Sequence, residues 1–170
     1  MEKVIYINTF SKSLAPAFRI SYLVLPKHLV TRFYDTLGFY SGTVSCLEQM
    51  TLARFLSEGY FEKHINRMRN HYRAVRDKLL AALRQSPLAG KVKISAEQAG
   101  LHFLMELDTQ RPDEDILRDA EARDLRISFV SQYYFAQENR RPHVLVMNYS
   151  GLEEEKIDQA VQRLCQAVLG

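Results

Sequence analysis

Two short, almost uninterrupted apolar runs near the N-terminus constrain the fold most. Val4–Ile7 is β-branched and aromatic with no helical start signal before it, and Ile20–Leu25 is a second run that Pro26 ends. Both are typical of buried strands, which need other elements over both faces of their sheet. Two such strands cannot cover themselves. We therefore expect them to be the edge of a larger sheet whose other strands lie outside this chain.

The middle of the chain is predicted to be helical. Lys27–Gly38 predicts a short helix, and helical signals continue from Cys46 to Gln85 with a kink or break at Gly59. In the second half, apolar residues recur at spacings of three and four, which predicts one long helix with a single apolar face. These residues are Phe61, Ile65, Met68, Tyr72, Val75, Leu79 and Leu83.

Beyond Gly90 the apolar period changes to two, which indicates strands of a different sheet. In chain order, we expect strands at 92–94 and 101–107, a helix over 112–123, strands near Ile127–Val130 and His143–Asn148, and a final helix. Ser150–Glu153 matches a capping box for that last helix, whose apolar stripe is Ile157, Val161, Leu164 and Val168.

This pattern predicts an α/β chain in three parts. Residues 1–45 would be the remnant of a large domain, residues 46–87 a connecting helical region, and residues 88–170 a small α+β domain.

Composition narrows the class of protein. The 170 residues are 46% hydrophobic and 25% charged, as in folded globular chains. No apolar stretch approaches the ~20 residues of a membrane span, and no export signal is visible, so we expect a soluble protein without a membrane partner. Cys46 and Cys165 lack metal-type spacing, which fits a reducing, cytoplasmic location. The net charge of +3 is too small to demand a polyanionic partner.

The loop Thr9–Pro16 carries the main candidate site. It places Lys12 between hydroxyl residues directly after a strand, with Arg19 just before the next one. Hydroxyls, loop N–H groups and a guanidinium fork are suited to hold a phosphate, and a lysine partly desolvated beside another cation can capture a carbonyl as a Schiff base. The alternative is a solvated loop lysine whose neighbouring hydroxyls cap the next turn.

Thr9-Phe10-Ser11-Lys12, followed by Arg19 and Ile20-Ser21-Tyr22, resembles the pyridoxal-phosphate (PLP) lysine motif of fold type I aminotransferases. Further segments resemble the aminotransferase-like domain of MocR-type regulators in the GntR superfamily. They are 14–20, 58–69, 99–102 and 148–152. The resemblance implies the C-terminal portion of the PLP-dependent transferase fold, also called the aspartate aminotransferase-like fold.

By this resemblance, Lys12 would form the internal aldimine with PLP and shuttle the substrate proton, and Thr9, Ser11, Lys12 and Arg19 would bind the cofactor. An amino acid or amine would be the substrate or effector, and the protein would be a homodimer. DNA would be contacted only through an N-terminal winged helix that this chain lacks.

Two departures from the aminotransferase pattern bear on activity. The acidic partner of the pyridinium nitrogen precedes the lysine in the family, and here only Glu2 is available. The arginine that holds a substrate carboxylate belongs on a late strand, but His143–Asn148 is apolar there. Arg140 and Arg141, just before it, are the alternative. Ordinary transamination by this chain alone is therefore not expected.

Three functions are weighed: the effector domain of a MocR-type regulator, part of a genuine class I/II aminotransferase, and a cofactor-free interaction module. Other features favour no further site. The basic residues of 63–78 indicate a solvated or interdomain face, and His64 and His71 lack a third metal ligand. The aromatic cluster Gln132–Phe135 would line a ligand cleft or pack in a core or interface.

Overall fold

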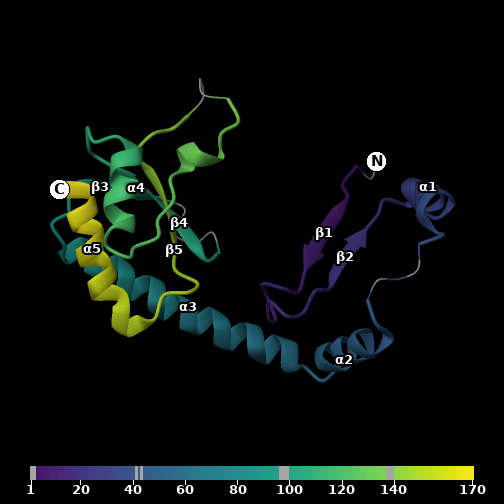
Figure 1. The fold of residues 1–170 in the computed structure, drawn as a ribbon. Coiled ribbons are helices and arrows are strands. Elements are labelled where there is room, and N and C mark those ends of the chain that lie inside the picture. Colours follow the sequence, from purple (N-terminus) through teal and green to yellow (C-terminus); the bar gives the residue numbers. More distant parts are fainter. Residues whose placement is uncertain (1–2, 41, 43, 96–99, 137–139) are drawn as a thin grey trace. The chain divides into compact units, whose positions relative to one another are not determined.

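The structure is a computed structural model that describes residues 3–40, 42, 44–95, 100–136 and 140–170. The chain divides into two compact units, Met1–Arg69 and Asn70–Gly170 (Figure 1). Helix α3 (Tyr60–Gln85) contributes residues to both units. None of the described helices is long and apolar enough to cross a membrane.

The first unit contains the two predicted N-terminal strands, β1 (Tyr6–Thr9) and β2 (Ser21–Val24), as an antiparallel pair. Their existence is confirmed, but the expectation that they are buried is wrong for this chain. Ile7 is 68% exposed and Val24 is 55% exposed, because the sheet that the structure describes here has only these two strands. Both faces of the pair therefore carry apolar side chains that water reaches.

Helices α1 (Lys27–Leu37) and α2 (Cys46–Ser57) follow the strand pair, as predicted. The Ser45 hydroxyl accepts a hydrogen bond from the Glu48 backbone N–H at the start of α2. The predicted break at Gly59 is confirmed, and its φ of +73° explains why glycine stands there. Along α3, the predicted stripe is fully buried at Val75, Leu79 and Leu83 and half-buried before them.

The second unit is a three-stranded antiparallel sheet with helices packed against its apolar side. The strand order is β3 (Val92–Ser95), β4 (His102–Leu107) and β5 (Val144–Asn148). Alternate residues of β4 are buried, as its period of two predicts. The helices are α3, α4 (Asp113–Glu121) and α5 (Ile157–Leu169). The core includes Leu83, Phe103, Met105, Ile116, Phe129, Leu145, Ile157 and Leu164.

The strand predicted at Ile127–Val130 is wrong. Only Phe129 bridges to β5, opposite Leu145, and the Ser128 carbonyl accepts the Val146 N–H at 2.8 Å. The chain then turns into a short 3₁₀ helix, η1 (Val130–Tyr133), because the Gln132 side chain accepts the Phe129 N–H at 2.9 Å. That bond uses a backbone group which a strand would need for pairing.

The capping box predicted at Ser150–Glu153 is also wrong. The Ser150 hydroxyl donates to the Asn148 side chain at 2.8 Å, and the Leu152 N–H donates to the Tyr149 carbonyl, which makes a turn. A 3₁₀ turn, η3 (Glu154–Lys156), follows before α5 begins at Ile157. The predicted stripe of α5 is nevertheless confirmed, because all four of its residues are buried.

Candidate functional site: the lysine loop

The lysine loop, residues 9–20, joins β1 to β2 within the first unit. At its base the Phe10 N–H donates to the Ile20 carbonyl at 2.9 Å, which extends the strand pairing by one bond. A turn follows, in which the Leu14 N–H donates to the Phe10 carbonyl at 2.8 Å, and a second bond joins Phe18 to Ala15. The backbone of the loop is thus held by its own hydrogen bonds.

Three of the four predicted site residues meet inside this loop. The Thr9 hydroxyl donates to the Ser11 hydroxyl oxygen at 3.2 Å, and the Arg19 guanidinium donates to the same oxygen at 3.3 Å. The Ser11 hydroxyl itself donates to the Phe18 carbonyl at 2.7 Å. Two hydroxyls and one permanently charged guanidinium therefore converge within hydrogen-bonding distance of one another.

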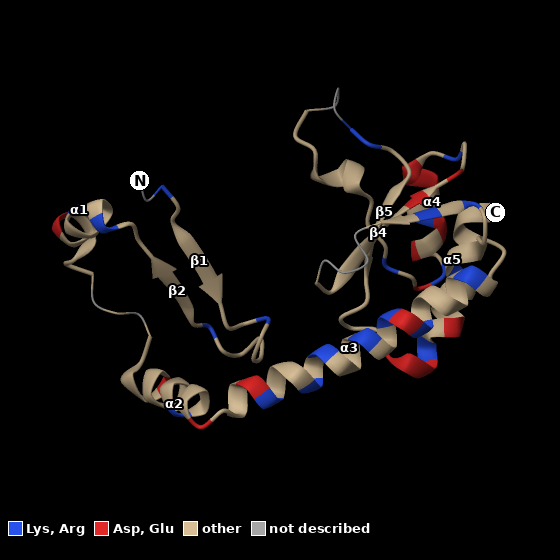
Figure 2. Ribbon diagram, turned by 180° about the vertical axis from the view of Figure 1, so that it is seen from behind, with Lys and Arg blue, Asp and Glu red and all other residues tan. Residues whose placement is uncertain are grey.

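Lys12 lies on the turn between these groups and is exposed. Within the described part of the chain, no hydrogen bond or ion pair holds its ammonium group. In Figure 2, cationic positions mark the loop end of the β1–β2 pair in blue. The loop therefore presents one free amine beside a guanidinium and two hydroxyls.

Aromatic rings to which the sequence analysis gave no role in the site support the loop. The Phe10 ring lies 5.6 Å from the ring of Tyr22 and 5.8 Å from that of Phe61, measured between centroids. Phe10 precedes Ser11 directly, so its packing fixes the start of the turn. The sequence shows Phe10 inside the Thr9–Lys12 motif, but it does not show which rings Phe10 contacts, because Tyr22 and Phe61 lie on later segments of the chain.

A second polar group lies on one face of the strand pair. The Asn8 amide donates to the Tyr6 hydroxyl at 2.9 Å and to the Tyr22 hydroxyl at 3.5 Å. The pKa of Tyr22 is raised above its ordinary value, chiefly because of its hydrogen bond with Tyr6 and secondarily because of desolvation. These contacts therefore favour the protonated phenol of Tyr22.

The donor set suits a phosphate better than a metal ion. Hydroxyl and guanidinium N–H groups are the donors that phosphate oxygens accept, and arginine can bind two of them at once. Among the described residues, no group of three histidine, cysteine or acidic side chains is placed to hold a metal. Glu2, the only acid that the sequence analysis found before the lysine, lies outside the described residues, as does Ala99 of the 99–102 motif.

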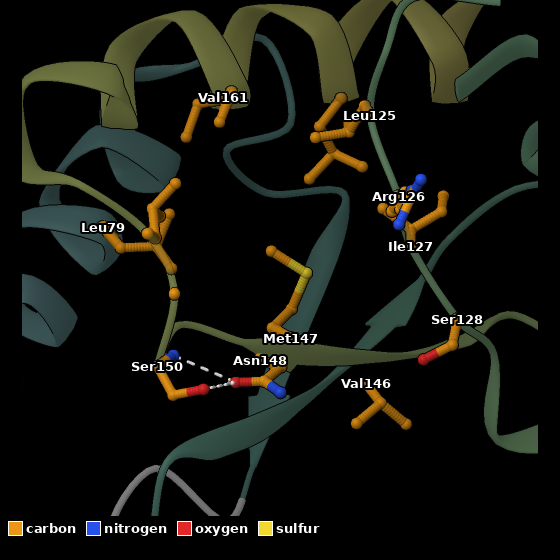
Figure 3. Close-up of a pocket in the computed structure, with 14 residues that line it drawn as sticks. Leu79, Leu125, Arg126, Ile127, Ser128, Val146, Met147, Asn148, Ser150 and Val161 are labelled. Carbon is orange, nitrogen blue, oxygen red and sulfur yellow. Dashed lines mark hydrogen bonds between the residues drawn. The ribbon is translucent and has the colours of Figure 1, made fainter. Parts of the chain in front are cut away.

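A groove of about 730 Å³ lies in the second unit (Figure 3). It is mostly apolar, and β5 contributes Val146, Met147 and Asn148 to its lining. The structure confirms β5 as a strand without arginine, at the place where the resemblance would put a carboxylate-binding one. Arg140 and Arg141 are exposed in the segment before it.

Sequence comparison finds transcriptional regulators and aminotransferases. The HTH-type transcriptional regulator YdeL of Bacillus subtilis is 36% identical over 162 residues, which are 95% of this chain and 34% of YdeL. The probable rhizopine catabolism regulatory protein MocR of Rhizobium meliloti is 32% identical over 167 residues, covering 98% of this chain and 33% of MocR. Aromatic-amino-acid aminotransferase 1 of Thermococcus litoralis is 26% identical, covering 98% of this chain and 39% of that enzyme. The chain thus spans about a third of the length of these regulators. No family model matches the sequence.

Solved structures give the same fold. The α-aminoadipate aminotransferase LysN of Thermus thermophilus, complexed with N-(5'-phosphopyridoxyl)-L-leucine, superimposes with a TM-score of 0.80 at 25% identity, over 98% of this chain and 42% of LysN. The kynurenine aminotransferase of Pyrococcus horikoshii gives a TM-score of 0.81 at 26% identity, over 96% of this chain and 40% of that enzyme. The chain is therefore the C-terminal part of an aminotransferase-like domain of fold type I, similar to that of MocR-type transcriptional regulators.

Proposed function

We propose that this chain is part of a PLP-binding effector domain in a MocR-type regulator. The observation that carries the proposal is the convergence of Thr9, Ser11 and Arg19 beside the exposed amine of Lys12. The division of the chain in this proposal is a large-domain remnant at 1–45, a connecting helical region at 46–87 and a small domain at 88–170.

Each residue of the lysine loop has a distinct role in this proposal. Thr9, Ser11 and Arg19 bind the cofactor phosphate, which takes over hydrogen bonds that these groups now make with one another. Lys12 binds the cofactor covalently and moves a proton at the substrate α-carbon. The bound cofactor supplies an electron sink for that carbon.

The regulator is favoured over an enzyme by β5 and by the comparisons. An aminotransferase needs a cation for the substrate carboxylate, and the strand expected to supply it reads Val144–Asn148. The regulators YdeL and MocR are also more similar in sequence than the Thermococcus aminotransferase is. In this proposal the effector is an amino acid or amine, the protein is a cytoplasmic homodimer, and DNA is contacted by a winged helix outside this chain.

A genuine class I/II aminotransferase is the second candidate. It is supported by relatives named as transaminases, such as the 2-aminoadipate transaminase of Thermus thermophilus at 28% identity. Turnover distinguishes the two. A regulator releases no keto acid beyond one equivalent per cofactor, whereas an aminotransferase turns over repeatedly with an amino donor and a keto acid.

The test of cofactor binding is reductive labelling. The full-length protein that contains this chain is incubated with PLP, reduced with borohydride, digested and mapped by mass spectrometry. We expect the pyridoxyl group on Lys12. Lys12→Arg should lose the label, and Lys27→Arg, a matched change outside the loop, should keep it. A label on another residue would overturn the assignment of Lys12, and the absence of any label would favour the cofactor-free interaction module.

The 170-residue chain by itself should bind PLP weakly. In this proposal the lysine loop binds the phosphate and supplies the amine. No described residue of the first unit is given the role of binding the pyridine ring of PLP. At a PLP concentration close to that of the protein, we expect no aldimine absorbance band from the isolated chain. A band at full occupancy under these conditions would show that the loop alone is sufficient.

A further inference from the structure

The groove in the second unit has an apolar interior. Its most buried lining residues are Leu79, Val161 and Leu164, and each of them is no more than 5% exposed. Figure 3 shows the Met147 side chain pointing from β5 toward α5, into the same region. Small-molecule sites are commonly lined in this way and measure about 300–1,000 Å³. With a volume of about 730 Å³, the groove has the size and the interior of such a site.

The rim of the groove is polar and carries one charge. Arg126, Asn148 and Ser150 line the groove and are exposed, so they lie where it meets water. Among the fourteen described residues of the lining, Arg126 is the only charged one. No hydrogen bond or ion pair holds its guanidinium within the part of the chain that the structure describes. The rim therefore carries a positive charge that the lining does not neutralise.

Asn148 adds an oriented donor to the rim. Its Oδ1 accepts the backbone N–H of Ser150 at 3.0 Å and the hydroxyl of the same residue at 2.8 Å (Figure 3). Since the oxygen is used in this way, the side-chain N–H groups of Asn148 are left to donate. A guanidinium and an amide N–H are both donors, so the rim is suited to an acceptor with negative charge.

A monocarboxylate with an apolar body matches both parts of the groove. Its carboxylate can accept two parallel hydrogen bonds from Arg126, while its apolar body leaves water for the interior. One guanidinium balances the single charge of a carboxylate, whereas a phosphate monoester carries a charge of about −1.5 to −2 at neutral pH. A cation is disfavoured, because none of the described lining residues is acidic.

We propose that this groove binds a monocarboxylic acid with an apolar body. The carboxylate is held by Arg126 at the rim, and the apolar body lies against Met147 and the groove-facing side of α5. Every described residue of the lining belongs to the second unit, so this is a ligand site additional to the lysine loop. Binding at the groove therefore requires neither PLP nor Lys12.

Methionine methyl NMR on the 170-residue chain tests this proposal with octanoate as the probe. The Met147 methyl signal should shift and saturate, because this residue lines the groove. The signals of Met105, which is fully buried in the core, and Met50, which is exposed in the first unit, should not shift. The uncharged 1-octanol should bind about threefold to tenfold more weakly, the range for an ion pair at an exposed rim. Octylammonium should give no saturable shift.

Three variants separate the charge from the apolar interior. Arg126→Gln should weaken octanoate binding by about threefold to tenfold and leave 1-octanol binding within about twofold. Arg73→Gln is the matched control, because Arg73 is an exposed arginine of the same unit outside the lining. It should keep octanoate binding within about twofold. Ala160→Leu places a larger side chain in the interior and should weaken octanoate and 1-octanol alike.

Several results would overturn the carboxylate site. Octanoate that gives no saturable shift at Met147 would do so, as would native octanoate affinity in Arg126→Gln or in Ala160→Leu. Equal affinities for octanoate and 1-octanol would show that the groove recognises apolar surface alone. Octylammonium that binds as tightly as octanoate would remove Arg126 from the recognition of charge.

Discussion

The sharpest stability prediction concerns Phe129, the residue that remained in the core where the predicted strand did not form. Its side chain is fully buried, and it belongs to the core cluster of the second unit. Truncation to alanine removes that apolar surface and leaves a cavity, which costs about 3–5 kcal/mol for a buried phenylalanine. Domains of this size are stable by only about 5–15 kcal/mol. Phe129→Ala should therefore lose a large part of the stability of the unit.

Urea unfolding followed by far-ultraviolet circular dichroism measures this loss, since the chain has no tryptophan to report by fluorescence. With a denaturant slope of about 1.5 kcal/mol/M, the midpoint should fall by about 2–3 M. Phe135→Ala is the matched control, because the same residue type stands six positions later and is fully exposed. It should shift the midpoint by less than about 0.3 M. A loss below about 1 kcal/mol for Phe129→Ala, or equal losses in both variants, would refute the assignment of Phe129 to the core.

Three further predictions concern charged and phenolic groups. Arg111 donates to Asp119 at 2.5 Å and lowers the pKa of that carboxyl below its ordinary 3.8. The pairing therefore stabilises the folded state at pH values above the unfolded-state pKa, and this stabilisation is lost as the pH falls through the folded-state pKa. Acid unfolding curves of Asp119→Asn should lack this pH-dependent loss. In the full-length protein, Arg19→Ala should weaken PLP binding by about tenfold or more in an absorbance titration, and Arg19→Lys should restore only part of it, because lysine cannot bind two oxygens in a plane; equal affinity for all three proteins would remove Arg19 from the phosphate site. Tyr6→Phe should lower the pKa of Tyr22 toward 10.0 in an ultraviolet titration, because it removes the largest cause of the upward shift; an unchanged value would assign the shift to desolvation.

The helices and the alternating strands were predictable because their signals are local. A stripe at spacings of three and four requires only the geometry of the helix that carries it, and α3 and α5 bury their predicted faces. Gly59 was equally readable, since a positive φ is a property of one residue. In the same way, the lysine motif predicted a loop directly after a strand, and the structure places it between β1 and β2.

The wrong strand at Ile127–Val130 and the wrong capping box both come from side chains that form hydrogen bonds close to the backbone. Gln132 accepts the Phe129 N–H and ends the pairing after one bridge, and Asn148 accepts from Ser150 before that serine can cap a helix. Glutamine and asparagine also occur at strand ends and in turns, so the sequence did not show that Gln132 would end the strand or that Asn148 would replace the capping box. The sequence analysis also missed that Asp113 accepts hydrogen bonds from Ser131 and His143. As the first residue of α4, Asp113 also fits an acidic residue placed for the helix dipole, and these two partners are far away in sequence.

The lysine loop shows which part of the proposed cofactor site a short segment can form alone. The bonds that shape it, from Phe10 to Ile20 and from Ser11 to Phe18, close within the loop and need no residue of another strand. The phosphate donors can therefore be placed even where the apolar faces of β1 and β2 are exposed. Control of the Lys12 amine is different, because Lys12 is exposed here and capture of a carbonyl requires an amine that is shielded from water. Phosphate binding should thus be a local property of the loop, whereas covalent capture at Lys12 should depend on the residues that cover the sheet in the full-length protein.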